Sequence, residues 1–209
     1  MIKVIKSFLM LGQSNIAGRG FINEVPPIYN ERIYMLRNGR WQMMTEPINY
    51  DRPVSGISLA GSFAEAWSCK NKDDIIGLIP CAEGGSSLDE WAVDKELFRH
   101  AVNEAKFAKE SSELVGILWH QGENDSNNGN YKVYYKKLLV IIEALRKELN
   151  APDIPIIIGG QISLLMPDLK IGQDGLQDII KRVVMTKNMI FGSIVKPVQL
   201  TELVEIRQM

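Results

Sequence analysis

The stretch SFLMLGQSN, residues 7–15, runs from an apolar segment directly into a short polar cluster. The same arrangement recurs in IIGLIPCAEGGSS, residues 75–87, and in LVGILWHQGEND, residues 114–125. A short apolar run that ends in glycine and polar residues is typical of a strand buried in a parallel sheet. The sequence therefore predicts three interior strands, each followed by a polar loop at its carboxyl end.

Helical segments separate these strands along the chain. Residues 130–149 predict an amphipathic helix, because apolar side chains recur every three to four positions with lysines opposite. The apolar positions of this helix are Tyr131, Tyr135, Leu138, Ile142, Leu145 and Leu149. Further helices are predicted at residues 58–68 and 97–108, and strands at about residues 5–11, 75–82, 113–120 and 154–162. Strands that alternate with helices form parallel βαβ units, so the predicted fold class is α/β.

Two regions lack this alternation. Residues 19–56 contain prolines and asparagines without a sustained period, and we expect a long loop region beside the site, in which residues 32–37 and 39–44 could pair as a hairpin. The apolar clusters at residues 179–184 and 189–195 could form a helix and a strand, but the turn and cap signals around them are poor. We expect one domain over residues 1–209, with a divergent or truncated C-terminal segment at residues 163–209.

The composition argues against several classes of partner. Net charge is -1 and the basic residues are spread along the chain, which predicts neither a nucleic-acid surface nor a polybasic membrane patch. No apolar run reaches the length of a membrane span, and residues 1–11 lack a signal-peptide cleavage site. Cys69 and Cys81 have neither metal-ligand nor disulfide spacing, so we expect a reducing, cytoplasmic setting.

Four residues in the polar loops are candidates for nucleophilic chemistry. Ser14 lies where a strand gives way to a helix and could be a nucleophile or, alternatively, an ordinary helix N-cap. The backbone N–H groups of Gly84 or Gly85 could face a ligand, or the pair could form a tight turn. Gln121 carries a neutral amide donor able to bind a developing oxyanion, and a buried structural amide is the alternative.

The other polar residues of these loops suggest supporting roles. Because side chains alternate along a strand, His120 and Gln121 point to opposite sides, which favours a packed histidine at position 120 over a catalytic base. Glu123 and Asp125 lack partnered histidines and are weak candidates for a metal pair. We expect these two acids to fix the loop through backbone N–H groups or to contact substrate hydroxyls. His100 lies within a predicted helix and is assigned no chemistry.

These clusters, in this order, resemble the SGNH (GDSL-like) hydrolases, and among them the carbohydrate esterase branch of the sialate O-acetylesterase and acetylxylan esterase type. In that branch the nucleophile block reads GQSN and the third block reads HQGE, which stand here at residues 12–15 and 120–123. A Gly-Gly-Ser block lies between them at residues 84–86. The resemblance covers roughly residues 5–162.

The resemblance implies a three-layer αβα sandwich with a mostly parallel, five-stranded sheet, and removal of acetyl groups from sugar hydroxyls. Ser14 would attack the acetyl carbonyl, and the oxyanion would be bound by the Ser14 N–H, an N–H of Gly84 or Gly85, and the Gln121 side chain. No metal or organic cofactor is expected, and the partner is an acetylated carbohydrate. Substrate contacts are expected from three side chains of the same loops, Gln13, Asn15 and Glu123, of which Asn15 also braces the nucleophile loop.

The sequence departs from the family at its last motif. The family ends on an Asp-x-x-His block whose histidine is the base, and the nearest match here is Asp174-Gly175-Leu176-Gln177. Asp174 is carried over as a catalytic residue, but Gln177 cannot accept and return a proton. In a serine hydrolase, loss of the histidine costs about a millionfold in rate. We therefore expect reduced or lost activity, and a truncated or frameshifted C-terminus would explain the missing histidine.

Two alternatives to an impaired esterase remain open. The chain could be a non-catalytic carbohydrate-binding remnant that keeps the sugar cleft. His120, or a residue of a partner chain, could instead provide the base. The esterase interpretation requires that Ser14, the glycine pair and Gln121 lie in one pocket.

Overall fold

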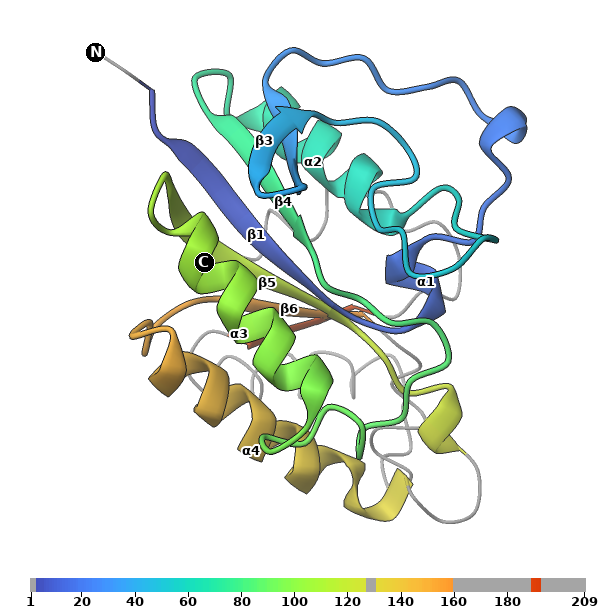
Figure 1. Ribbon diagram of the computed structural model, residues 1–209, viewed down its shortest axis with the longest axis vertical. Coiled ribbons are helices and arrows are strands. Elements are labelled where there is room, and N and C mark those ends of the chain that lie inside the picture. Colours follow the sequence, from blue (N-terminus) through green and yellow to red (C-terminus); the bar gives the residue numbers. More distant parts are fainter. Residues whose placement is uncertain (1–2, 127–130, 160–188, 193–209) are drawn as a thin grey trace, which may run out of the picture.

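The computed structural model describes residues 3–126, 131–159 and 189–192, and within these ranges one seven-stranded sheet forms the centre of the fold (Figure 1). The strand order is β3-β2-β4-β1-β5-β6-β7. Neighbouring strands are parallel except β2 and β3, which form an antiparallel hairpin. The strands are β1 Ile5–Gly12, β2 Ile33–Arg37, β3 Arg40–Met43, β4 Ile75–Pro80, β5 Ser112–His120, β6 Ile156–Gly159 and β7 Met189–Gly192.

Helices cover both faces of this sheet, so the described part of the chain has three layers. Helices α3 and α4 pack on one face, and α1 and α2 pack on the other (Figure 1). The helices are α1 Ser14–Ala17, α2 Leu59–Lys70, α3 Glu96–Ala108 and α4 Tyr131–Glu148, with short 3-10 turns η1 Ile22–Glu24 and η2 Asn124–Ser126. The predicted α/β sandwich with a mostly parallel sheet is confirmed.

The central strand β1 shows why both faces need a cover. Its side chains alternate, so that Phe8 and Met10 join the core beneath α2 while Leu9 and Leu11 join the core beneath α3 and α4. All four side chains are almost completely buried. A strand that is apolar on both sides can only be stable in the middle layer of a sandwich, which is the position that the continuous apolar run of residues 8–11 predicts.

The sheet has seven strands instead of the five that the resemblance implies. The hairpin that residues 32–37 and 39–44 were expected to form does exist, as β2 and β3. It does not lie apart from the sheet, because β2 pairs in parallel with β4 through Ile33, Tyr34 and Met35. Within the predicted loop region at residues 19–56, β2 and β3 therefore widen the central sheet, and the rest of the region is largely irregular.

The apolar stripe of α4 differs from the prediction at its first turns. Leu138, Ile142 and Leu145 are buried as expected, but the buried tyrosine is Tyr134, whereas Tyr135 is only partly buried. Tyr134 replaces Tyr135 because its hydroxyl reaches the end of β5, where it donates to a backbone oxygen. The hydrogen bond of a buried tyrosine hydroxyl thus decides which tyrosine is buried, although the apolar spacing of the helix predicted the other.

The C-terminal predictions lie mostly outside the described residues. Strand β6, Ile156–Gly159, lies within the strand predicted at residues 154–162. Strand β7, Met189–Gly192, lies within the apolar cluster at residues 189–195 and pairs in parallel with β6. The predicted helix at residues 179–184 and the Asp174 block fall outside the described ranges.

Candidate active site

The loops that follow β1, β4 and β5 meet at one edge of the sheet (Figure 1). Strand β1 lies between the other two, and Gly12 at its end pairs in register with His120 at the end of β5. The loop after β4 joins them, because Glu83 N donates to Gly12 O at 3.0 Å. The polar clusters that carry Ser14, the glycine pair and Gln121 therefore gather at the carboxyl edge, where open α/β sheets bind ligands.

Ser14 is the first residue of α1 and is half-buried. Gln13 precedes it as the N-cap, without a side-chain capping bond. The interpretation of Ser14 as an ordinary N-cap is therefore wrong. Gly12, with φ 126°, makes the sharp turn, and a side chain there would overlap the His120 carbonyl at 2.0 Å. The turn brings the strand and the Ser14 loop so close to β5 that only glycine fits at this position.

Glu123, which follows β5, binds the loop that contains Ser14. Its carboxylate accepts hydrogen bonds from the side-chain amides of Gln13 and Asn15, the two neighbours of Ser14. Gln13 Oε1 in turn accepts the backbone N–H of Gly122 at 3.3 Å. Burial raises the pKa of Glu123, and the bond from Asn15 opposes that rise. The three side chains predicted to contact substrate thus hold the Ser14 loop and the loop after β5 together.

The Gly84–Gly85 turn is held by side chains from the loop before α2. Gly84 N donates to Asp51 Oδ2 at 2.8 Å, and Arg52 Nη2 donates to Gly84 O. Asn124 Nδ2 donates to Gly85 O at 2.8 Å. Among the residues that the structure describes, none accepts a hydrogen bond from Gly85 N. Of the two candidate oxyanion donors, Gly84 N is occupied by Asp51 and Gly85 N is available.

Asp51 is the residue with the buried side chain among those that hold the Gly84–Gly85 turn. Its side chain is 2% exposed and forms an ion pair with Arg19, whose Nη2 lies 2.6 Å from Oδ2. Burial opposes ionisation of Asp51, but hydrogen bonds from Arg19, Gly84 N and Ser55, together with the charge of Arg19, lower its pKa to about 2. A Cβ atom on Gly84 would lie 2.0 Å from Arg19 Nη2, so this ion pair packs directly on the glycine. The carboxylate therefore stays ionised and keeps its hold on the turn.

Gln121 connects the third loop to the second from a fully buried position. It is 2% exposed, and its Nε2 donates to Ser86 O at 3.0 Å and to Asp125 Oδ2 at 2.6 Å. Asp125 Oδ2 also accepts Leu88 N at 2.8 Å, as expected for a loop-fixing acid. Tyr134 donates its hydroxyl to Gln121 O at 2.8 Å. Both amide hydrogens of Gln121 have partners, so an oxyanion role stays a prediction and requires one of them to change partner.

Among the described residues, neither His100 nor His120 forms a hydrogen bond with Ser14. His120 is 7% exposed, and its ring packs on β6, where a Cβ atom on Gly159 would lie 2.7 Å from His120 Cδ2. Burial lowers the pKa of His120, and its Nδ1 is buried without a hydrogen-bond partner among the described residues. His100 is exposed on α3. Asp174 lies outside the described residues.

The described residues also bear on metals and membranes. Within residues 3–126, 131–159 and 189–192, His, Cys, Asp and Glu side chains form no group of three that could hold a metal ion. Over the same ranges, no helix combines the length and the apolar character needed to cross a bilayer. Cys69 is exposed and Cys81 is buried, and both are free thiols.

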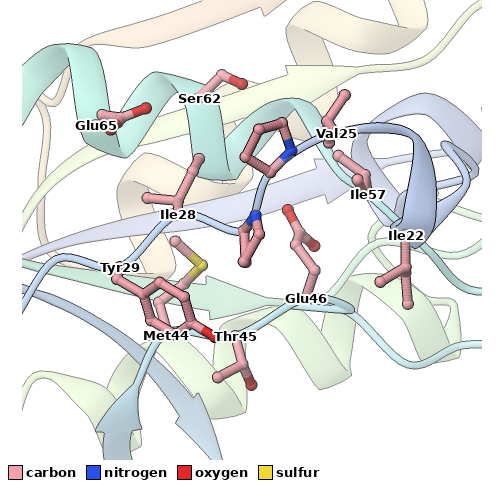
Figure 2. A pocket seen from close by; sticks show the side chains of 12 residues that line it. Ile22, Val25, Ile28, Tyr29, Met44, Thr45, Glu46, Ile57, Ser62 and Glu65 are labelled. Carbon is pink, nitrogen blue, oxygen red and sulfur yellow. The ribbon is translucent and has the colours of Figure 1, made fainter.

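A pocket of about 430 Å³ is lined by other residues (Figure 2). Its walls come from the segment before β2, from the segment after β3 and from α2. Glu46 projects into it but accepts backbone N–H bonds from Ser58 and Ile48 through its two oxygens. Ser14, the glycine pair and Gln121 do not line this pocket.

Several residues of the site were missed by sequence reasoning. Asp51, Arg19 and Arg52 support the glycine turn from a region without helical or strand periodicity. Asn49 belongs to the same support, because its side-chain amide makes two hydrogen bonds of 3.0 Å with the backbone of Ala82. The pattern around these residues gives no signal, since their partners lie more than thirty positions along the chain.

The sequence and the fold of this chain are similar to those of known proteins. A "Probable carbohydrate esterase" from Arabidopsis thaliana is 31% identical over 172 residues, which cover 72% of this chain and 66% of that protein. The solved structure of the Arabidopsis protein superposes with a TM-score of 0.75 at 26% identity, covering 91% of this chain and 85% of the other. In the sequence comparison, this chain covers 66% of the length of the Arabidopsis protein, just under two thirds.

Two further solved structures share the fold. NanS superposes with a TM-score of 0.67 at 18% identity, covering 95% of this chain and 80% of its own. A carbohydrate acetylesterase from Xanthomonas citri gives a TM-score of 0.61 at 13% identity, covering 91% and 50%. Residues 4–196 match the sequence family described as carbohydrate esterase, sialic acid-specific acetylesterase. The resemblance to SGNH-type carbohydrate esterases is confirmed, and the chain belongs to this carbohydrate esterase family.

Proposed function

We propose that this chain removes acetyl groups from carbohydrate hydroxyls through an acetyl-serine intermediate on Ser14. The proposal is supported by the strand register and hydrogen bonds that join three loops at one sheet edge, and these loops contain Ser14, the Gly84–Gly85 turn and Gln121. Membership of the carbohydrate esterase family supports an acetylated carbohydrate as the substrate class. Acetylated sialic acids and acetylated xylan are the two substrates that we propose to test first.

The proposed reaction is a two-step acyl transfer. Ser14 Oγ forms a bond to the acetyl carbonyl carbon and gives up its proton, and the carbonyl oxygen becomes an oxyanion. The N–H groups of Ser14 and Gly85 are the donors that we assign to this oxyanion, with Gln121 as a third after a change of partner. Collapse of the intermediate breaks the ester C–O bond, and the sugar oxygen leaves with a proton. Water then attacks the acetyl-serine, releases acetate and returns the proton to Ser14.

Slow turnover is part of the proposal, because the sequence lacks the histidine expected to act as the base. His100 and His120 are its two histidines, and Gln177 stands where the related motif has its histidine. Loss of the histidine costs a serine hydrolase about a millionfold in rate. We propose that water, in place of a histidine, takes the proton from Ser14.

The cellular setting is a separate part of the proposal. The two free thiols support a reducing, cytoplasmic setting for this activity.

Ester hydrolysis by matched serine variants tests the nucleophile. We expect Ser14→Ala to abolish release of 4-nitrophenol from 4-nitrophenyl acetate above the rate of buffer. Ser62→Ala should keep the full rate, because Ser62 is an exposed serine on α2 away from the site. Equal rates for the unchanged chain and Ser14→Ala would reject serine catalysis.

A gain-of-function variant tests the missing base. Gln177→His restores the Asp-x-x-His pattern with Asp174. If the proposal is correct, the Ser14-dependent rate rises by about 10²-fold or more and follows the titration of an imidazole near neutral pH. A rate that stays unchanged would show that residue 177 does not stand at the position of the base.

A non-catalytic carbohydrate-binding protein is the second candidate. It is favoured by the burial of His120 against β6 and the exposure of His100 on α3, which leave both histidines in poor positions to serve Ser14. Calorimetry with acetylated xylo-oligosaccharides would then give saturable binding, and Gln177→His would add no hydrolysis. Absence of binding to the purified chain would leave this candidate without support.

A further inference from the structure

The peptide unit between Gly84 and Gly85 is held at its oxygen by Arg52. Arg52 Nη2 donates to Gly84 O, and the same nitrogen lies 3.3 Å from Glu83 Oε1. Glu83 is itself fixed to the end of β1, because its N–H donates to the Gly12 carbonyl. The guanidinium therefore anchors this carbonyl to the framework of the site.

The orientation of one end of a peptide unit determines that of the other. In a planar trans peptide the C=O of one residue and the N–H of the next point in opposite directions. Fixing Gly84 O toward Arg52 therefore turns Gly85 N–H away from Arg52. That N–H has no acceptor among the residues that the structure describes, so it can serve a ligand.

Two adjacent glycines make this orientation vulnerable. Gly85 has φ 78°, a conformation that glycine adopts without strain. Because neither residue has a Cβ atom, the backbone torsions on both sides of the intervening peptide are less restricted than in other residues. A rotated unit would present the Gly84 oxygen in place of the Gly85 N–H, and an oxygen repels an oxyanion. A hydrogen bond to Gly84 O from outside the turn therefore selects the orientation in which Gly85 N–H is the donor.

We infer that Arg52 is a positioning residue, which keeps Gly85 N–H directed at the oxyanion of the reaction. This inference rests on the proposed esterase function. Asp51 assists by occupying Gly84 N–H, which leaves Gly85 as the available donor of the pair. Arg52 acts through the peptide unit and makes no contact with the reacting atoms.

The surroundings of Arg52 make the role testable without unfolding the chain. The backbone of this segment is fixed by other residues, since Asn49 binds Ala82 and Asp51 binds Arg19 and Gly84. The Arg52 side chain itself is 52% exposed. Its removal should therefore leave the fold intact, since exposed ion pairs contribute little to stability.

Nuclear magnetic resonance of the Gly85 amide tests the inference independently of catalysis. In the unchanged chain the Gly85 N–H should have an order parameter near the rigid value of about 0.85, and in Arg52→Met it should fall toward about 0.6. Arg52→Lys, which keeps a donor, should restore much of the rigidity. Arg99→Met is the matched control, because Arg99 is exposed on α3. A Gly85 amide that is as rigid in Arg52→Met as in the control would overturn the inference.

Kinetics with 4-nitrophenyl acetate gives the second test. Loss of an oxyanion donor lowers kcat by about 10²–10³-fold, and an intermittent loss of its orientation should lower kcat by about tenfold with little change in KM. Arg52→Lys should recover most of that loss. A raised KM with an unchanged kcat would overturn the inference, because it would mean that Arg52 contacts the substrate. If the unchanged chain shows no Ser14-dependent hydrolysis, the proposed function fails, and the Gly85 amide still decides whether Arg52 orients the turn.

Discussion

Replacement of Asp125 tests how the loops of the site are held together. Asp125 is 5% exposed, and its Oδ2 accepts Leu88 N at 2.8 Å and Gln121 Nε2 at 2.6 Å. Asp125→Ala leaves both donors buried without this acceptor. Each unsatisfied buried donor costs about 1–3 kcal/mol, so the free energy of unfolding should fall by about 2–6 kcal/mol.

A second variant separates the charge from the acceptor. Asp125→Asn can keep an oxygen where Oδ2 lies and so preserve both hydrogen bonds. A bond to a charged group contributes about 1.5–3 kcal/mol and one between neutral groups about 0.5–1.5 kcal/mol. The loss for two bonds is therefore about 2–3 kcal/mol, toward the lower end of the range for Asp125→Ala. Asp125→Asn should thus be less destabilising than Asp125→Ala.

Urea unfolding followed by tryptophan fluorescence measures both effects. Trp91 and Trp119 are buried with ring centroids 5.4 Å apart, so their emission reports on this part of the core. Asp89→Ala is the matched control, because the Asp89 side chain is 68% exposed and pairs with Lys137 at the surface. It should change stability by less than about 1 kcal/mol. A loss in Asp125→Ala no larger than that of Asp89→Ala would refute the reasoning.

Three further predictions concern the turn glycine, the buried ion pair and a helix end. Gly12→Ala should lose several kcal/mol more than Gly39→Ala in urea unfolding, because its Cβ would lie 2.0 Å from a backbone oxygen whereas the Gly39 position has 3.8 Å of clearance. The folded pKa of Asp51 lies below its unfolded value, so its contribution to stability is present above about pH 4 and is lost as pH falls toward 2; Asp51→Asn should flatten the unfolding free energy over that window. Arg32→Ala should cost about 1–3 kcal/mol in thermal unfolding, because Arg32 binds the carbonyls at the C-terminal end of α2; an unchanged midpoint would contradict this.

The layers of the fold follow from local patterns in the sequence. The run Phe8 to Leu11 alternates between two apolar faces, and no arrangement but a covered sheet buries both. The positions of α3 and α4 in the sequence likewise follow from the spacing of their apolar side chains. The place of the β2–β3 hairpin could not be predicted in this way, because its pairing with β4 depends on strands that are about forty positions apart.

That the loops carrying Ser14, the glycine pair and Gln121 lie at one sheet edge was predictable from topology alone. Each follows a strand of a parallel sheet, and the carboxyl ends of adjacent parallel strands lie at the same edge. The hydrogen-bond partners of these residues were not predictable. Asp125 and Ser86 take both amide hydrogens of Gln121, and no motif indicates that choice.

The sequence by itself determined the middle layer, the covering helices and the edge at which the site lies, because each depends on the periodicity of neighbouring residues. The tertiary structure alone decided which N–H of the glycine pair is available, since Asp51 reaches Gly84 N across 33 positions of chain. The physical reason is that a buried donor binds the nearest suitable acceptor in space. The path of the intervening loop, and not the local sequence, brings that acceptor into place.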